Sequence, residues 1–324
     1  MNGSFIPYHL RQNKAIDRNL FVEALSMINR VYPIKDYQYI SMGGPFLEDF
    51  KVVHAATGIK KMISFESRNE TFRRQKFNCP LNCIDLLEAD STSFIHDHSF
   101  DDPTIIWLDF TTTLDKCLSD IFELAAKLKE GDIVKLTFNA DAASIHPIGR
   151  NRSIAQLKER LLTLDGMLGA YLPTDADHLM VTDEKYPDLL FRMVELVIDR
   201  AMGKTGKLFF QPLTAYVYAD SARMLTCTGI VLNRTKSMTF LNETGIRKWK
   251  LGVVGKSRPL PISVPELSIK ERMFLDALLP KSGTALLQKR LKHLIAPKDD
   301  ESLEGIRNYA MYYRQFPYFS KITF

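Results

Sequence analysis

Disulfides and membrane-spanning segments are both ruled out by what this sequence lacks. Only four of its 324 residues are cysteines, at positions 79, 83, 117 and 227, too few to staple a chain of this length. No window approaches the roughly 18 to 20 uncharged apolar residues that a membrane-spanning helix needs. The polar residues 1–4 do not resemble the start of a signal peptide. We therefore expect four free thiols and a protein of the cytoplasm, with no membrane partner.

Two motifs of common enzyme classes and a strong charge excess are also missing. The chain has no Gly-x-Ser-x-Gly nucleophile elbow and no phosphate loop ending in Gly-Lys-Ser or Gly-Lys-Thr. Its 43 basic and 38 acidic residues give a net charge of only +5. Most of the surplus lies in the last third of the chain, where such runs are more often a solvated face than a nucleic-acid footprint. Nucleic acid is therefore not the favoured partner.

The main positive signal is an alternation of strands and helices. Apolar spacing predicts strands over residues 37–42, 61–65, 83–89, 104–108 and 133–138, and helices over residues 14–30, 46–56, 67–77, 114–129 and 188–202. In the first helix, Asp17 and Arg18 fall off the apolar stripe. Short apolar strands alternating with helices indicate a parallel sheet that helices cover on both faces. Strands over residues 213–219 and 224–232, joined by a tight turn, predict an antiparallel hairpin appended to it.

Two parts of the chain differ in texture. Residues 1–250 are predicted to form the α/β domain, with an insertion or lid at about residues 140–186, where the strand pattern weakens. Residues 251–324 are predicted to form a helical extension, in which Ser268 and Glu271 make a capping box at the start of a helix. Aromatic residues crowd positions 309–324, and we favour a docking anchor over a platform for stacking bases.

Candidate ligand-binding residues follow four successive predicted strands, the position where open parallel sheets bind ligands. At Gly43 and Gly44 the missing side chains let a ligand approach the backbone. Glu66 is placed to accept hydrogen bonds from both hydroxyls of a ribose. Asp90 is placed to accept one from an adenine amino group, and Asp109 to act on the reacting end. Each residue alone is explained as well by a turn or a helix cap, so the joint pattern carries the hypothesis.

With these residues the sequence resembles the class I S-adenosylmethionine-dependent methyltransferases over about residues 14–235. More specifically, it resembles a bacterial family of proposed O-methyltransferases. The segments that carry this resemblance are residues 8–14 (YHLRQNK), 43–50 (GGPFLEDF), 61–66 (KMISFE), 74–80 (RQKFNCP) and 107–111 (WLDFT). The resemblance implies a Rossmann-like seven-stranded methyltransferase sheet, parallel with an antiparallel terminal hairpin, and S-adenosylmethionine as the cofactor.

The resemblance also assigns roles to residues. It matches the two glycines to the first cofactor motif, Glu66 to the ribose ligand, Asp90 to the adenine side and Asp109 to the motif after the fourth strand. Because the first motif has only two of the usual glycines, Arg11 or Lys14 is expected to hold the methionine end. The predicted cofactor-binding set is Lys14, Met42, Gly43, Gly44, Glu66, Ser67, Asp90 and Ser91. Asp109 is the predicted catalytic residue.

We therefore expect a methyltransferase that acts on an oxygen of an unidentified acceptor, with no metal. Asp109-Phe110-Thr111 lacks the Pro-Pro-aromatic signature of enzymes that methylate amino groups on bases. One alternative is an inactive methyltransferase-like cofactor sensor or partner subunit, associated with nucleic acid. Another is a dehydrogenase that uses a nicotinamide dinucleotide, against which the glycine-poor turn argues. A metal site at His96 and His98 is the less favoured explanation of those residues, because no third ligand is evident.

Overall fold

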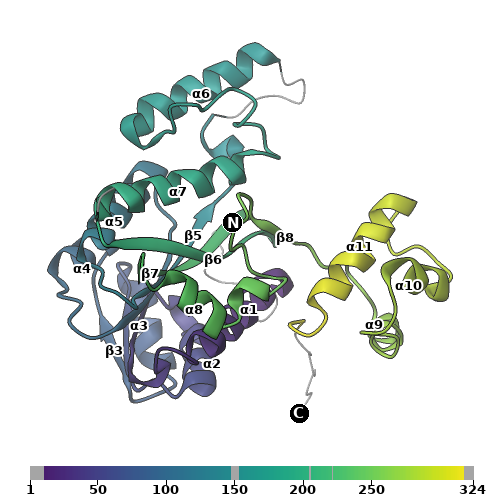
Figure 1. The fold of residues 1–324 in the computed structure, drawn as a ribbon, viewed down its shortest axis with the longest axis horizontal. Helices are drawn as coiled ribbons and strands as arrows, with labels where there is room; N and C mark the ends of the chain where they lie inside the picture. The colour runs from purple at the N-terminus through teal and green to yellow at the C-terminus, as the bar shows by residue number, and fades with distance from the viewer. Residues whose placement is uncertain (1–10, 147–152, 204–205, 221, 317–324) are drawn as a thin grey trace.

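A computed structural model describes residues 11–146, 153–203, 206–220 and 222–316. Its centre is a sheet of strand order β3-β2-β1-β4-β5-β7-β6-β8 (Figure 1). The strands are β1 Gln38–Ser41, β2 Lys61–Phe65, β3 Ile84–Leu87, β4 Thr104–Asp109, β5 Ile133–Asn139, β6 Leu208–Ala219, β7 Arg223–Asn233 and β8 Leu260–Ile262. Neighbouring strands are parallel except where β7 pairs with β5 and with β6. The predicted parallel sheet with an antiparallel hairpin is therefore confirmed.

The sheet has one strand more than the seven predicted. β8 pairs in parallel with β6, with Leu260 opposite Tyr216 and Ile262 opposite Tyr218. Prolines obscured this strand, because Pro261 has no amide to donate to a ladder. An edge strand tolerates proline, since only one of its sides is paired.

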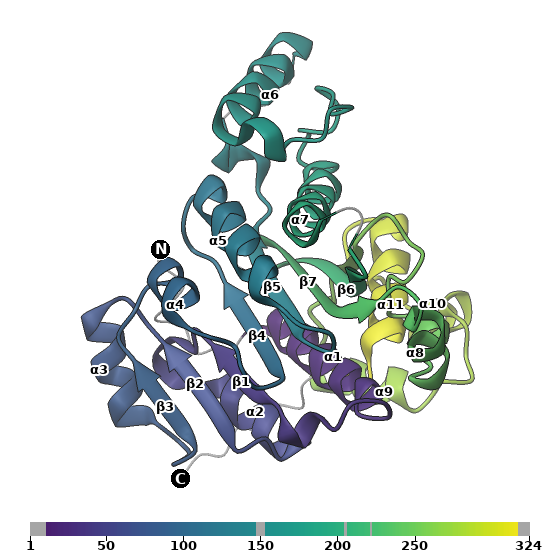
Figure 2. The same ribbon diagram turned by 60° about the vertical axis from the view of Figure 1, so that its left-hand side comes forward.

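Helices cover both faces of the sheet (Figure 2). They are α1 Gln12–Ile28, α2 Glu48–Thr57, α3 Asn69–Asn78, α4 Ser91–Asp97, α5 Leu114–Lys127, α6 Ile154–Leu168, α7 Tyr186–Met202, α8 Ser237–Glu243, α9 Ile269–Asp276, α10 Thr284–Leu291 and α11 Asp299–Tyr312. Adjacent strand residues enter opposite cores: Ile105 packs with residues of α1, α2 and α8, and Ile106 with residues of α4, α5 and α7. Burial on both faces explains why β4 has four apolar residues in succession rather than an alternating pattern.

The insertion between β5 and α7 contains a helix, α6, that the sequence pattern did not predict. It stands away from the sheet (Figure 1), and Ser153 and Gln156 form a capping box at its start. Buried Arg160 anchors it by donating to the backbone oxygens of His146 at 3.0 Å and Val181 at 2.9 Å. Because one of its four buried positions is an arginine, the helix shows no clean apolar stripe.

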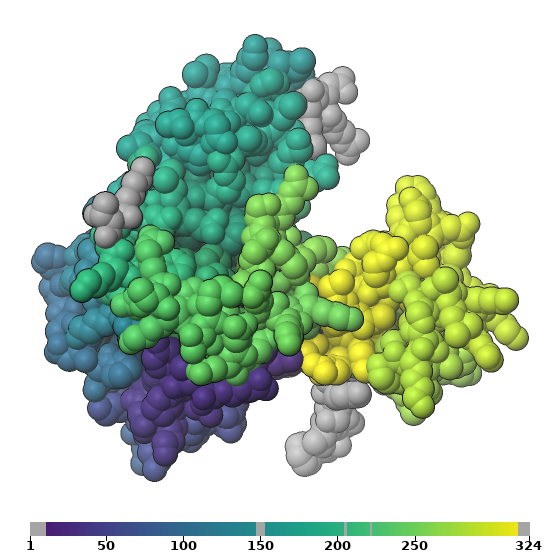
Figure 3. All heavy atoms as spheres, in the orientation of Figure 1, coloured from purple at the N-terminus to yellow at the C-terminus, as the bar shows by residue number. Residues whose placement is uncertain are grey.

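The helices α9, α10 and α11 form a separate lobe, yellow in Figure 3. Tyr309, Tyr312 and Phe316 are buried in a core that also contains Leu251 of the connecting segment and Ile16 of α1. The predicted docking anchor is confirmed for these three aromatics, while residues 318, 319 and 324 lie outside the described residues. The domain boundary at residue 250 stays a prediction.

All four cysteines are free thiols, as predicted. Burial raises the pKa of the Cys117 thiol to about 11 and that of Cys227 to about 12, so both stay protonated at neutral pH. Within the described ranges, no helix combines the length and the apolar content that a bilayer crossing requires.

Candidate active site

The residues predicted from the strand ends lie along one edge of the sheet. β3, β2, β1 and β4 are neighbours in that order and all run parallel, so their carboxyl ends form one row. Asp90, Glu66, Gly43 and Asp109 stand at these ends in the same order. Three spacings between strands separate the first from the last, roughly 14 Å. This row is long enough for a nucleoside at one end and a reacting group at the other.

The turn after β1 requires glycine at position 43. Gly43 has φ 66°, in the left-handed region, and a Cβ on it would lie 2.6 Å from Leu47 Cδ2 and 2.6 Å from Ser64 Oγ. The requirement for glycine therefore comes from the packing of Leu47 and Ser64 against the turn. The neighbouring Met42 and Gly44 are partly exposed, so the turn lies at the surface beside the strand ends.

α3 holds this turn through two side chains that sequence reasoning did not identify. Buried Gln75 donates from Nε2 to the backbone oxygens of Met42 at 3.0 Å and Gly44 at 2.8 Å. Asn78 donates to the backbone oxygen of Pro45 at 2.8 Å. Both residues lie in segment 74–80, one of those that carried the family resemblance. The resemblance of that segment to the family was therefore the one sequence signal that pointed to these two side chains.

The helix after the turn starts later than predicted, and this bears on which ligand fits. Residue 46 lies in a 3-10 turn, and α2 begins at Glu48, so its first turn carries Glu48 and Asp49. Carboxylates already occupy the positive end of the helix dipole, and Pro45 contributes no amide. A dinucleotide pyrophosphate binds at a helix N-terminus in many proteins, but here the two carboxylates would repel it. The geometry argues against the dehydrogenase alternative.

Glu66 has the chemistry that a ribose ligand needs. It stays within the ladder between β2 and β3, because its amide donates to the Leu87 oxygen and its own oxygen accepts from the Ala89 amide. Its Oε1 accepts from the Arg68 amide at 2.9 Å, and the Arg68 guanidinium lies 3.6 Å away. A carboxylate offers about four acceptor sites, so this contact leaves capacity for hydroxyl donors.

At the end of β3 the predicted residues have structural partners. Asp90 is the N-cap of α4, and its Oδ1 accepts from the Ser93 amide at 2.9 Å, a bond that lowers the Asp90 pKa. Buried Ser91 donates to Asp120 Oδ2 at 2.5 Å. Ser67 is exposed at the turn after β2. The cofactor roles of Asp90, Ser91 and Ser67 stay predictions.

At the end of β4 the structure joins two predicted residues. Lys14 Nζ lies 2.6 Å from Asp109 Oδ2; the Lys14 side chain is buried, and the Asp109 side chain is partly exposed. Asp220, in the turn between β6 and β7, accepts from the backbone amides of Asn13 at 3.2 Å and Lys14 at 3.0 Å. This carboxylate fixes the first turn of α1 above the strand ends. The contact places an ammonium group and a carboxylate at the proposed reacting end.

A second lysine–aspartate pair lies one turn further along α1. Lys135 Nζ of β5 lies 2.8 Å from Asp17 Oδ1 and donates to Thr226 Oγ1 at 2.9 Å. Burial lowers the Lys135 pKa, an effect that the Asp17 carboxylate opposes. The placement of Asp17 off the buried stripe was wrong, and Arg18 is buried too. The available signal was Lys135 itself, since a lysine inside an apolar strand needs a partner.

His96 and His98 have separate partners. His96 Nδ1 lies 3.1 Å from Glu123 Oε1, whereas His98 Nε2 lies 3.2 Å from Gln38 Oε1. The His98 ring also stacks on Phe94. The two imidazoles therefore do not converge on one point, which argues against a shared metal.

Comparison with known proteins matches residues 6–324 to the family described as "Putative O-methyltransferase". A search of the curated proteins finds no match. A search of the solved structures finds similar proteins, among them the three that follow. Trm1 from Pyrococcus horikoshii with S-adenosyl-L-methionine is 13% identical, with a TM-score of 0.46, and the match covers 70% of this chain and 57% of Trm1. The N-methyltransferase NodS from Bradyrhizobium japonicum is 9% identical, with a TM-score of 0.39, and the match covers 67% of this chain and 97% of NodS. The O-methyltransferase TomG from Streptomyces achromogenes with SAM is 9% identical, with a TM-score of 0.38, and the match covers 68% of this chain and 80% of TomG. The chain therefore spans little more than half the length of Trm1.

Proposed function

The chain belongs to the O-methyltransferase family that it matches over residues 6–324, and from this premise we propose that it transfers the methyl group of S-adenosylmethionine to an oxygen atom of its acceptor. The observation that carries the proposal is the row of Glu66, the glycine turn and the Lys14–Asp109 pair along adjacent strand ends. We place this activity in the cytoplasm, which the four free thiols support.

The residues of the row fit the proposed donor. Glu66 would accept hydrogen bonds from the ribose hydroxyls, with Asp90 on the adenine side. The backbone of Met42 and Gly44 would line the middle of the molecule. The Lys14 ammonium, beside Asp109 at the end of β4, would bind the methionine carboxylate.

The chemistry at the other end follows from positioning. When bound, the sulfonium of the donor supplies an electrophilic methyl group. Asp109 orients the acceptor hydroxyl and takes up its proton as the oxygen gains the methyl group. Lys14 keeps the Asp109 carboxylate in place above β4. Alignment of the acceptor oxygen by these side chains supplies most of the rate.

Calorimetric titration with S-adenosylmethionine and S-adenosylhomocysteine tests the proposal. We expect micromolar binding of both by the wild type and a loss of about 10- to 100-fold in Glu66→Gln, because the neutral amide is a weaker acceptor for the hydroxyls. Glu70→Gln, at an exposed position on α3, is the matched control and should bind as the wild type does. Failure of both ligands to bind, or unchanged binding by a folded Glu66→Gln, would contradict the proposal.

A further inference from the structure

α3 presents a basic and aromatic surface to solvent. Arg73, Arg74, Lys76 and Phe77 are all exposed on it. Phe77, at 91%, is the most exposed large apolar side chain in the described part of the chain. Residues 67–80 carry four cationic side chains and one carboxylate. We call Arg73, Arg74, Lys76 and Phe77 together the α3 surface.

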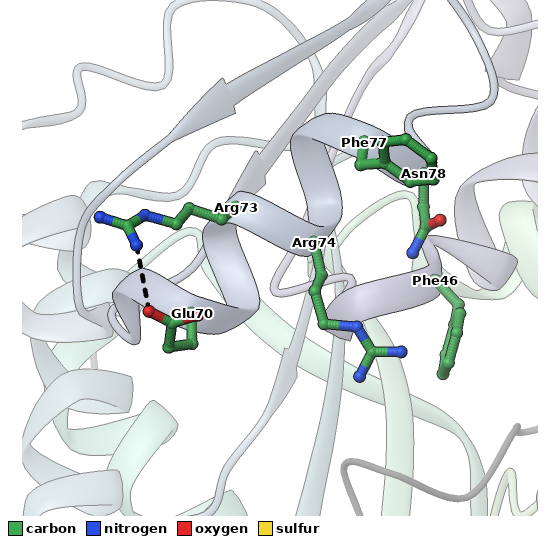
Figure 4. Close-up of a pocket in the computed structure, with 6 residues that line it drawn as sticks. All are labelled: Phe46, Glu70, Arg73, Arg74, Phe77 and Asn78. Atoms are coloured by element: carbon green, nitrogen blue, oxygen red, sulfur yellow. Dashed lines mark hydrogen bonds and ion pairs between the residues drawn. The ribbon is translucent and has the colours of Figure 1, made fainter.

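A hollow of about 380 Å³ opens between the α3 surface and the 3-10 turn after β1 (Figure 4). Its lining residues are Phe46, Glu70, Arg73, Arg74, Phe77 and Asn78. The Arg74 guanidinium lies over the Phe46 ring, 5.0 Å from its centre, and Arg73 pairs with Glu70 at 3.2 Å. None of the predicted cofactor residues lines this hollow, so it is distinct from the proposed donor site.

We propose that the α3 surface binds single-stranded nucleic acid. Its cations suit a chain of phosphates, whose binding releases counterions and needs no base sequence. Phe77 offers a ring on which an unpaired base can stack, and Arg74 on Phe46 offers a second flat face. A duplex has no free base faces for these rings. The cationic excess favours a polyanion over a protein partner.

The position of this surface gives the binding a consequence. Gln75 and Asn78 of the same helix hold the backbone of the glycine turn. A strand bound along α3 would therefore lie beside the turn that we place against the methyl donor. This surface is separate from the basic C-terminal third of the chain.

Fluorescence anisotropy with labelled 20-nucleotide single strands of RNA and of DNA, and with a duplex, tests the proposal on the full chain. We expect both single strands to bind in 50 mM salt and the duplex to bind more weakly, and the two single-strand arms show which sugar is preferred. Phe77→Ala should weaken binding at least fivefold, the lower range of a lost base stack. Arg73→Ala with Lys76→Ala should lower the slope of log affinity against log salt by about 1.4.

Two controls keep the result specific. Ile269→Ala removes a strongly exposed apolar side chain from α9, and Lys248→Ala with Lys250→Ala removes two exposed cations from the C-terminal third. Both should bind as the wild type does. The proposal is overturned if neither single strand binds, or if the controls lose as much affinity as the α3 variants. It is also overturned if Phe77→Ala changes only self-association in sedimentation, because the surface would then join two copies of this chain.

Discussion

Two lysine–aspartate pairs join α1 to the sheet one helical turn apart, with opposite polarity and different depth. At the strand ends the helix supplies the cation, Lys14, and the side chains of Lys14 and Asp109 are 8% and 26% exposed. Beneath it the helix supplies the anion, Asp17, and the side chains of Asp17 and Lys135 are 0% and 1% exposed. The distances are nearly equal, 2.6 and 2.8 Å.

Depth, rather than distance, decides what each pair can do. Removing one partner of a buried pair leaves an uncompensated charge in the interior, so the Asp17–Lys135 pair fixes the position of α1. The Asp109 carboxylate is 26% exposed at the strand ends, so a substrate can approach the Lys14–Asp109 pair from that side. We expect the deep pair to serve the fold and, under the proposed function, the edge pair to serve the reaction.

The largest effect is expected from breaking the deep pair. Lys135→Met should lower the free energy of unfolding by about 3–5 kcal/mol, because Asp17 would remain buried without a cation. Urea unfolding followed by the fluorescence of Trp107 and Trp249 measures this loss. The double variant Lys135→Met with Asp17→Leu is the control and should recover most of it. A single variant within 1 kcal/mol of the wild type would remove the distinction between the two pairs.

Breaking the edge pair should affect the reaction instead. Asp109→Asn keeps the shape but cannot take up a proton, so we expect at least a 100-fold lower rate. The initial rate of tritium transfer from methyl-labelled S-adenosylmethionine to acceptors in a cell extract measures it. Donor affinity should stay near the wild-type value, and the urea midpoint should fall by less than in Lys135→Met. An equal loss of stability and of rate would show that Asp109 supports the fold.

The comparison also shows which features the sequence could predict. The bounds predicted for β2 and the observed ones, Lys61–Phe65, agree, because a strand buried on both faces is a mainly apolar run. Glu66 and Asp109 became candidates because each is the first carboxylate at the end of such a run. A local pattern thus predicted the row of strand ends.

The partners within each site could not be predicted in this way. Asp17 and Lys135 are 118 positions apart, so no local spacing connects them. In the sequence, Gln75 is one polar residue among many on a polar helix. Only the fold shows that the glycine turn packs against it. α6 and β8 were missed because an arginine and a proline occupy positions where the patterns expect apolar residues and amides. In each case a distant contact overrides the local signal.

Gln75 extends the comparison to a buried group without charge. Gln75→Leu should lower the free energy of unfolding by about 2 kcal/mol, because two hydrogen bonds from a buried side chain to the Met42 and Gly44 oxygens would be lost. The affinity for S-adenosylmethionine should fall as the turn loosens. Asn78→Leu, which frees only the Pro45 oxygen, should have a smaller effect in the same calorimetric and urea measurements. Equal effects of the two variants would show that the turn does not depend on Gln75.

Glu195 of α7 is a half-buried carboxylate beside both a second carboxylate, Asp199, and a cation, Arg192. Burial and the nearby Asp199 carboxylate raise its pKa from 4.5 to about 7, which Arg192 opposes in part. The folded state therefore binds more protons than the unfolded state between pH 4.5 and 7, so stability falls as the pH rises through this range. Glu195→Gln should be more stable than the wild type by about 1–2 kcal/mol at pH 8, after allowance for partial exposure, and equal to it near pH 4.5. A gain of the same size at both pH values would come from packing and not from charge, and would separate Glu195 from the rule of depth that the two pairs obey.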